Sequence, residues 1–367
     1  MLVVFIVSSI SLLLAYLSST GAFKKGLEYS FVIITVFFSI RYKYGSDYVG
    51  YMDVFNDISK YSSFKVLFNN YLSTDNVILS ELGWGVLNYL FKPFGFPFFV
   101  ACLTIFEYYI YYILVKKYVP KRCQWLAVFT FVLNPQILLL QLSMMRQALA
   151  IVLLILAVHL FIKEKRIYAV LCVICALLIH KSSIIVLPFF VVSFLYKYIG
   201  RLAFVFLIAI YFILIISKDY FSGIVALSFE SEMINSYAAY ESRVESTEMS
   251  IGLGFVFSLI PFFLLLRYIW LRKGDNTVNL FVFLGALSYA LAPISYIDSL
   301  LYRLVNYFTV YTIVAIPFAY YAIKDLTIRY SLVVIYLPIT LYSYYSFMMS
   351  PTWIKDFSTY HTILRII

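Results

Sequence analysis

The chain has few charged residues, and this scarcity decides its class. Only 13% of its 367 residues are charged, whereas 63% are hydrophobic. Apolar runs near the roughly 20-residue length that crosses a bilayer recur along it, which excludes a soluble domain. Runs such as 148–162 are continuous rather than alternating, so a spanning β-barrel is excluded as well. The sequence predicts an all-α, polytopic integral membrane protein.

Nucleotide-binding and metal-binding motifs are also absent. The sequence has no Walker loop, no dinucleotide glycine fingerprint, no Gly-x-Ser-x-Gly elbow and no Asp-x-Asp pair. ATP and nucleotide sugars are therefore not the expected donors. Cys172 and Cys175 have the spacing of a metal-binding pair, but no second Cys or His pair accompanies them. We expect neither a metal nor a cofactor.

The apolar segments predict twelve transmembrane helices in one integral domain, 1–367. They lie at about 2–19, 27–41, 97–115, 124–143, 147–162, 167–180, 183–196, 202–216, 251–271, 278–296, 304–323 and 330–347. Asn134-Pro135 should kink the fourth segment, because proline removes a backbone donor and crowds the preceding turn. The apolar run from 167 to 196 should break at His180-Lys181, since it is long for one span and short for two.

Charge predicts the orientation of the loops. Basic residues gather on one side of this map, which the positive-inside rule makes cytoplasmic, so both termini should face outward. The net charge of +10 then reflects topology, and nucleic acid is not an expected partner. Two longer outer loops remain, at about 41–96 and 217–250. The first ends in an amphipathic stretch, 81–92, that is too short to span and should lie at the interface or re-enter the membrane partway. The acidic second loop could close over a substrate or simply be solvated.

The scarce polar residues predict a shared outward-facing site. Arginine suits a diphosphate, because its planar fork pairs two oxygens at once and keeps its charge, and lysine adds a cation. Carboxylate and imidazole suit removal of a hydroxyl proton. An abundant diphosphate substrate that needs no nucleotide on that face is a sugar chain on a polyprenyl carrier. The cations are Arg41, Arg146, Lys181 and Arg303; the candidate bases are Asp47, Glu81 and His180.

Several of these residues have a structural alternative. Arg41 follows an apolar span and could simply anchor the chain by extending to the membrane interface. Glu81 could simply cap a helix. His180 could be a hydrogen-bonded group of the protein core. Residues at three- and four-residue spacing could form either a ligand face or a contact between helices. This last group comprises Arg303, Asn306 and Tyr307.

An ordered series of motifs resembles a known family. The series is Arg41–Tyr51, Glu81-Leu-Gly83, Met145–Ala150, His180-Lys-Ser182, and Arg303 with Tyr307-Phe308. In order and spacing, from about 41 to 308, it is similar to the EpsG-like branch of Wzy-type polysaccharide polymerases. The resemblance implies a bacterial plasma-membrane glycosyltransferase that joins polyprenyl-diphosphate-linked oligosaccharide repeat units on the outer face.

The resemblance also implies roles and partners. Donor and acceptor are both polyprenyl-diphosphate-linked oligosaccharides, membrane lipid surrounds the chain, and a chain-length regulator is a candidate protein partner. Asp47, Glu81 or His180 would activate the acceptor hydroxyl without a metal. The expected substrate-binding residues are Arg41, Arg146, Gln147, Lys181, Arg303, Asn306 and Tyr307.

Two other functions remain open at this stage. An outer-face glycan ligase would use the same chemistry on a different acceptor. A transporter or flippase for lipid-linked sugars would instead place charges along both halves of a central pathway. The polar residues gather at one end of the predicted spans, and Glu107 is the main exception.

Overall fold

The computed structural model describes residues 2–73, 81–188, 201–220, 253–271, 276–297 and 301–364. Within these ranges the regular secondary structure is helical, and an isolated antiparallel bridge pairs Arg41 with Thr362. The prediction of an all-α chain is thereby confirmed. Backbone contacts divide the chain into two compact units: Met1–Ile184 with Thr340–Ile367, and Ile185–Ile339.

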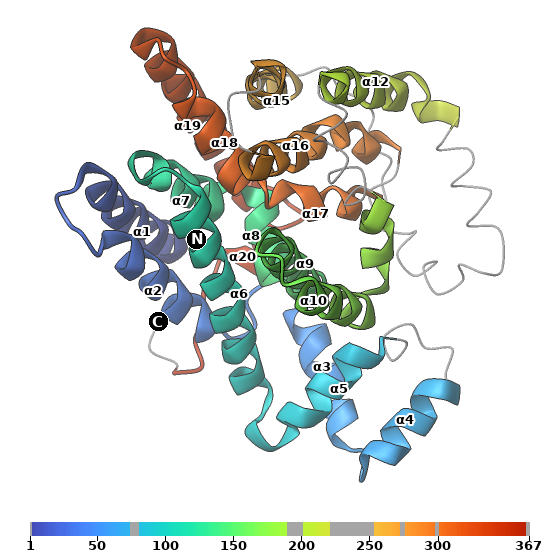
Figure 1. Ribbon diagram of the computed structural model, residues 1–367. Coiled ribbons are helices and arrows are strands. Elements are labelled where there is room, and N and C mark those ends of the chain that lie inside the picture. The colour runs from blue at the N-terminus through green and yellow to red at the C-terminus, as the bar shows by residue number, and fades with distance from the viewer. Residues whose placement is uncertain are drawn as a thin grey trace. The chain divides into compact units, whose positions relative to one another are not determined.

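The first unit begins with a group of apolar helices, drawn in blue and green in Figure 1. They are α1 (Leu2–Thr20), α2 (Gly26–Ser39), α6 (Phe96–Tyr118), α7 (Gln124–Leu133), α8 (Pro135–Leu142), α9 (Met145–Ile162) and α10 (Arg166–Ile179). Helix α1 packs on α2 and α7, and α6 packs on α2 and α9. Small residues let α1 and α2 approach closely: the buried hydroxyls of Ser11 on α1 and Ser30 on α2 lie 2.7 Å apart.

The break between α7 and α8 is a bend of 60°. Asn134 stands between the two helices in an extended conformation, and its Oδ1 accepts from the backbone N–H groups of Gln136 (3.0 Å) and Ile137 (3.3 Å). Pro135 opens α8, where its missing N–H costs nothing. The predicted kink at Asn134-Pro135 is confirmed, and the asparagine caps the helix that follows it.

Among the described residues, three short α-helices lie between α2 and α6 in the sequence. They are α3 (Tyr48–Ser59), α4 (Phe64–Ser73) and α5 (Leu82–Phe91). Helix α5 packs on α3, α4, α6 and α10. The core beneath it is aromatic and aliphatic, and includes Tyr48, Phe55, Trp84, Phe96, Phe99, Met145 and Ile179. The amphipathic stretch predicted to be too short to span is therefore a helix anchored to α10.

The C-terminal segment of the first unit returns to the start of this region. It contains the short helix α20 (Ile354–Phe357), and Tyr360 stacks on Phe37 with ring centroids 4.2 Å apart. Backbone hydrogen bonds join Tyr42 N to His361 O and Ile363 N to Ile40 O, each at 2.9 Å. This pairing holds the chain as it leaves α2.

The second unit is also helical. Its elements are α12 (Leu202–Ile216), α15 (Leu253–Leu271), α16 (Asn276–Ala290), the 3-10 helices η5 (Ala292–Tyr296) and η6 (Leu301–Leu304), α17 (Asn306–Thr309) and α18 (Thr312–Tyr321). Helix α16 packs on α12, α15, α17 and α18. Helix α19 (Leu326–Met349) runs from this unit into the first.

Among the described residues, five helices are long and apolar enough to cross a membrane, or six if the bent α7–α8 pair counts as one span. They are α1, α6, α9, the segment 277–295 and α19. Five shorter apolar helices accompany them, among them α2, α10 and α12. An integral membrane protein is thus supported, whereas the number twelve and the outward position of the loops stay predictions. Most of the acidic 217–250 loop lies outside the described residues.

Candidate functional site

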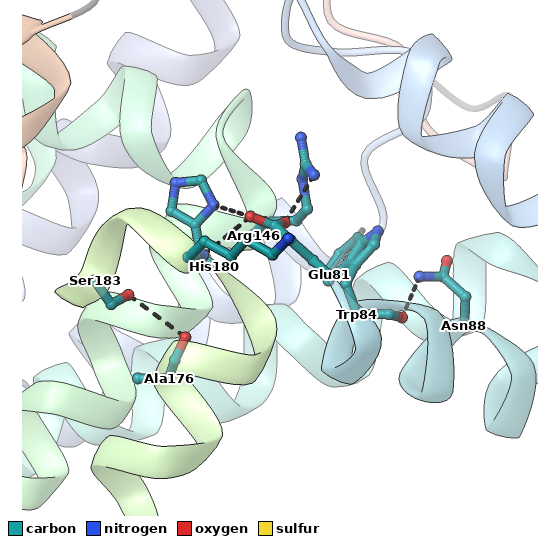
Figure 2. A network of polar contacts seen from close by, with 8 residues as sticks. Glu81, Trp84, Asn88, Arg146, Ala176, His180 and Ser183 are labelled. Carbon is teal, nitrogen blue, oxygen red and sulfur yellow. Dashed lines mark hydrogen bonds and ion pairs between the residues drawn. The ribbon is translucent and has the colours of Figure 1, made fainter. Parts of the chain in front are cut away.

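Glu81 is the residue around which the candidate site is built. It immediately precedes α5 and is only 6% exposed. Its side chain makes no capping hydrogen bond to its own helix, so the capping alternative does not account for it. The carboxylate is instead directed toward residues of α9 and of the segment after α10 (Figure 2).

Three groups contact the two carboxylate oxygens of Glu81. Arg146 donates from Nη1 to Oε2 at 2.7 Å. The Nδ1 atom of His180 lies 2.8 Å from Oε1, and the backbone N–H of Lys181 donates to the same oxygen at 3.1 Å. Residues separated by 65, 99 and 100 positions in the sequence therefore meet at one carboxylate.

Helix ends position the two side chains that meet Glu81. Helix α10 ends at Ile179, and His180 is extended (φ −150°, ψ 107°) before the 3-10 helix η3 (Lys181–Val186) begins. The predicted break at His180-Lys181 is thus confirmed. Arg146 lies in the first turn of α9, where the helix dipole disfavours a cation. The nearby carboxylate offsets that cost.

Electrostatics keep Glu81 ionised. Burial acts to raise the pKa of its carboxyl, but the hydrogen bond with His180 and the positive charge of Arg146 outweigh burial, so the pKa lies below its ordinary value. At neutral pH the group is a carboxylate. Glu81 and Arg146 then form a partly buried ion pair with the imidazole beside it.

Tyr51 and Trp84 form an aromatic wall beside the Glu81–Arg146 ion pair. The ring of Tyr51 on α3 lies under the Arg146 guanidinium, with 5.7 Å between the guanidinium carbon and the ring centroid. Tyr51 also meets the fully buried Trp84 edge-on, at a centroid distance of 5.5 Å. Tyr51 is not among the site residues predicted from the sequence, although it closes the first motif and follows Asp47 by one helical turn.

Asp47 lies at the start of α3 and is exposed. Its Oδ1 accepts a hydrogen bond from the Ser46 hydroxyl at 3.1 Å, and its backbone carbonyl accepts from the N–H of Tyr51 at 3.0 Å. Burial raises the pKa of the Tyr51 hydroxyl against the opposing positive charge of Arg146, and the negative charge of Asp47 adds to the rise. Asp47 therefore lies near the aromatic wall.

Arg41 binds a different part of the first unit. It is 3% exposed, and its Nη1 donates to the carbonyl of Phe38 (2.8 Å) and to the hydroxyl of Thr104 (2.7 Å). Its Nη2 lies 3.4 Å from the carbonyl of Gln141. The guanidinium thus ties α2, α6 and α8 together. The described contacts of Arg41 do not include Glu81, Arg146, His180 or Lys181, the four residues that we call the Glu81 cluster.

The remaining predicted substrate-binding residues fall in different places. Lys181 is exposed and joins the cluster through its backbone, and Gln147 is buried one residue after Arg146. The other three belong to the second unit. Arg303 is partly exposed in η6, and the buried Asn306 and Tyr307 open α17. Val305 separates the two elements, so Arg303 does not share one continuous helix with Asn306 and Tyr307.

Among the residues that the structure describes, no group of three or more His, Cys, Asp or Glu side chains could hold a metal ion. The groups here that could act chemically include the Glu81–Arg146 ion pair, the imidazole of His180, the phenol of Tyr51 and the carboxylate of Asp47. Such a set can neutralise an anion and accept a proton.

The candidate site lies within a region that matches a known protein family. The model of the EpsG family matches residues 28–361. The match includes α3, α5, the start of α9 and the end of α10, and so covers every element that supplies the Glu81 cluster. No curated protein and no solved structure gives a significant match.

Proposed function

The chain belongs to the EpsG family, and from this membership and the Glu81 cluster we propose that it is a membrane polysaccharide polymerase. Its substrates would be oligosaccharide repeat units linked to a polyprenyl diphosphate. The growing chain would leave its carrier and join the sugar of an incoming unit. The observation that carries the proposal is the meeting of Arg146, Glu81 and His180 at one place.

Arg146 would bind the diphosphate of the donor. Its Nε–H is buried and has no hydrogen-bond partner among the described residues, and a buried donor of this kind calls for an acceptor. A guanidinium neutralises the charge that grows on the diphosphate as the glycosidic bond breaks. Arg41, Gln147, Lys181, Arg303, Asn306 and Tyr307 remain proposed substrate-binding residues, and Tyr51 offers a face for a sugar ring.

The acceptor hydroxyl must lose a proton during transfer. Asp47, Glu81 and His180 are the groups that could take it. We place the reaction on the outer face of the bacterial plasma membrane, because the basic residues of the sequence gather in the loops of the opposite side. Lipid-linked repeat units on that face would reach the site by lateral diffusion in the membrane.

Deletion of the gene tests the proposal. In the deletion strain we expect single repeat units on the lipid carrier or on the final acceptor, and complementation with the wild-type gene should restore a ladder of chain lengths on a gel. An Arg146→Ala gene should fail to restore it at matched protein level. Long chains stranded on the carrier would identify a ligase instead.

Purified protein separates polymerase from transporter. Lipid-linked repeat units extracted from the deletion strain, mixed with the wild-type protein in detergent, should grow into longer chains. A transporter moves its substrate between compartments and leaves its length unchanged. Unchanged repeat units under these conditions would overturn the proposed function.

A further inference from the structure

The three candidate bases differ in how accessible their proton-accepting atoms are to a substrate. Both oxygens of Glu81 already accept hydrogen bonds, Oε2 from Arg146 and Oε1 from His180 and the Lys181 backbone. The Glu81 side chain is 7% exposed, whereas that of His180 is 20% exposed. The low exposure of Glu81 limits the access of a hydroxyl to its oxygens, whereas the imidazole of His180 is more open to a substrate.

The contact with Glu81 also settles which ring nitrogen of His180 is available. When the imidazole is neutral, the Nδ1–H donates to the carboxylate, so Nε2 carries the lone pair. Nε2 lies on the side of the ring away from Nδ1 and can accept a proton. A carboxylate that holds an imidazole in this way also stabilises the imidazolium that forms on proton uptake.

The backbone around His180 holds the ring in place. The N–H of His180 donates to the Ala176 carbonyl at 2.9 Å, and the N–H of Ser183 donates to the His180 carbonyl at 3.0 Å. The N–H of Lys181 binds the same Oε1 atom that meets the ring. Backbone and side chain of this turn are thus fixed to one carboxylate oxygen, which limits rotation of the imidazole.

Resting on the proposed polymerase function, we propose that His180 is the general base and that Glu81 is a positioning residue that acts through it. The acceptor hydroxyl gives its proton to Nε2 of His180 as its oxygen bonds to the anomeric carbon of the donor sugar. The bond from that carbon to the diphosphate oxygen breaks, and its electron pair leaves with the polyprenyl diphosphate. The imidazolium then releases the proton to water. The lowered pKa of Glu81 agrees with this division, because a weakly basic carboxylate orients better than it accepts protons.

Asp47 remains the alternative base, and its surroundings make it the weaker candidate. It is exposed, so water competes for its oxygens, and one of them already accepts from Ser46. The diphosphate is proposed to bind at the Glu81–Arg146 pair. His180 shares its partner with Arg146, so base and diphosphate site are fixed by one carboxylate.

The test compares single and double variants of the full-length purified protein. The substrate is the lipid-linked repeat unit extracted from the deletion strain, and chain growth gives kcat and KM. His180→Asn should lower kcat by roughly 100- to 10,000-fold. Glu81→Gln should also lower kcat, and the double variant should be no slower than the slower single variant, because both changes remove the same step. Glu164→Gln, at an exposed turn after α9, is the matched control and should grow chains normally.

A rescue experiment separates loss of the base from structural damage. Added imidazole should raise the rate of His180→Ala, since a free base can occupy the vacated space. This effect does not arise from a loss of packing. Failure of imidazole to raise the rate of folded His180→Ala would overturn the base assignment.

Other outcomes point elsewhere. If His180→Asn grows chains at the wild-type rate while Glu81→Gln does not, Glu81 itself is the base. If the losses of the two single variants multiply in the double variant, Glu81 does not act through His180. If the wild-type protein grows no chains, the polymerase function fails, whereas active wild-type protein with active His180 variants refutes only the role of His180.

Discussion

Gly83 on α5 lies directly against the backbone of Leu178 on α10. A Cβ atom at Gly83 would lie 2.9 Å from the carbonyl carbon and oxygen of Leu178. Real Cβ atoms essentially never come this close to other heavy atoms. Glu81 stands two residues before this glycine, and His180 stands two residues after Leu178. The close approach of the two helices therefore sets the distance between the carboxylate and the imidazole.

Substitution of this glycine should separate the pair. Gly83→Ala must push α5 away from α10, because the opposing atoms are backbone and cannot rotate aside. We expect a lower melting temperature, in line with overpacking costs of about 1 to 3 kcal/mol, and slower chain growth. Thermal unfolding followed by fluorescence and the in vitro elongation assay measure both effects.

The same helix provides the control for this change. A Cβ atom at Gly85 would meet nothing within 4 Å, so Gly85→Ala should leave activity normal and should hold or raise the melting temperature. Equal behaviour of the two variants would show that the contact between α5 and α10 does not position the site.

Arg146 offers a test of guanidinium geometry. If its fork binds the diphosphate, Arg146→Lys should fold yet lose much of the activity, and Arg146→Ala should lose more. A contact that strengthens as the diphosphate departs is worth about 2 to 4 kcal/mol, or roughly a 30- to 1000-fold loss of rate. Elongation assays at matched expression measure it. Arg122→Lys, at an exposed position before α7, is the control, and full activity in both Arg146 variants would refute the diphosphate role.

The sequence predicted the helical breaks better than the partners of the site. Proline after asparagine and a His-Lys pair within an apolar run are local signals, and both breaks occur where predicted. The carboxylate partners of Arg146 and His180 depend on how α5, α9 and α10 pack. Local patterns carry no such information. The predicted link from Arg41 to this cluster is not among the described contacts, because its guanidinium binds Phe38 and Thr104 instead.

The stability of the Glu81 cluster should depend on pH. The pKa of Glu81 is lowered in the folded protein, so its interactions stabilise the fold above the ordinary carboxyl pKa of 4.5. As pH falls below that value and through the lowered pKa, the contribution is lost. The difference in melting temperature between wild type and Glu81→Gln should therefore be largest near pH 7 and shrink in acid. A difference that grows as the pH falls would contradict the ion pair.

Thiol labelling tests the outward position of the site. Gly50→Cys and Lys181→Cys occupy exposed positions on α3 and at the start of η3, whereas Glu164→Cys occupies the turn after α9. In a protein whose four native cysteines are replaced by serine, an impermeant reagent should label the first two in intact cells. Glu164→Cys should react only after the membrane is opened. The reverse pattern would refute the predicted orientation.

Glu107 tests the transporter alternative. It lies in the middle of α6, is 4% exposed, and experiences the positive charge of Arg41. A buried carboxyl among aromatic neighbours has little use for its charge in a polymerase, because the proposed chemistry takes place around Glu81. Glu107→Gln keeps the shape of the side chain and removes its ability to ionise. The deletion strain complemented with this variant should therefore make polymer of normal length, judged on a gel at matched protein level. A transporter that moves its substrate past an ionisable group in the span would need the carboxyl, so loss of polymer from a normally expressed variant would favour that function over the polymerase.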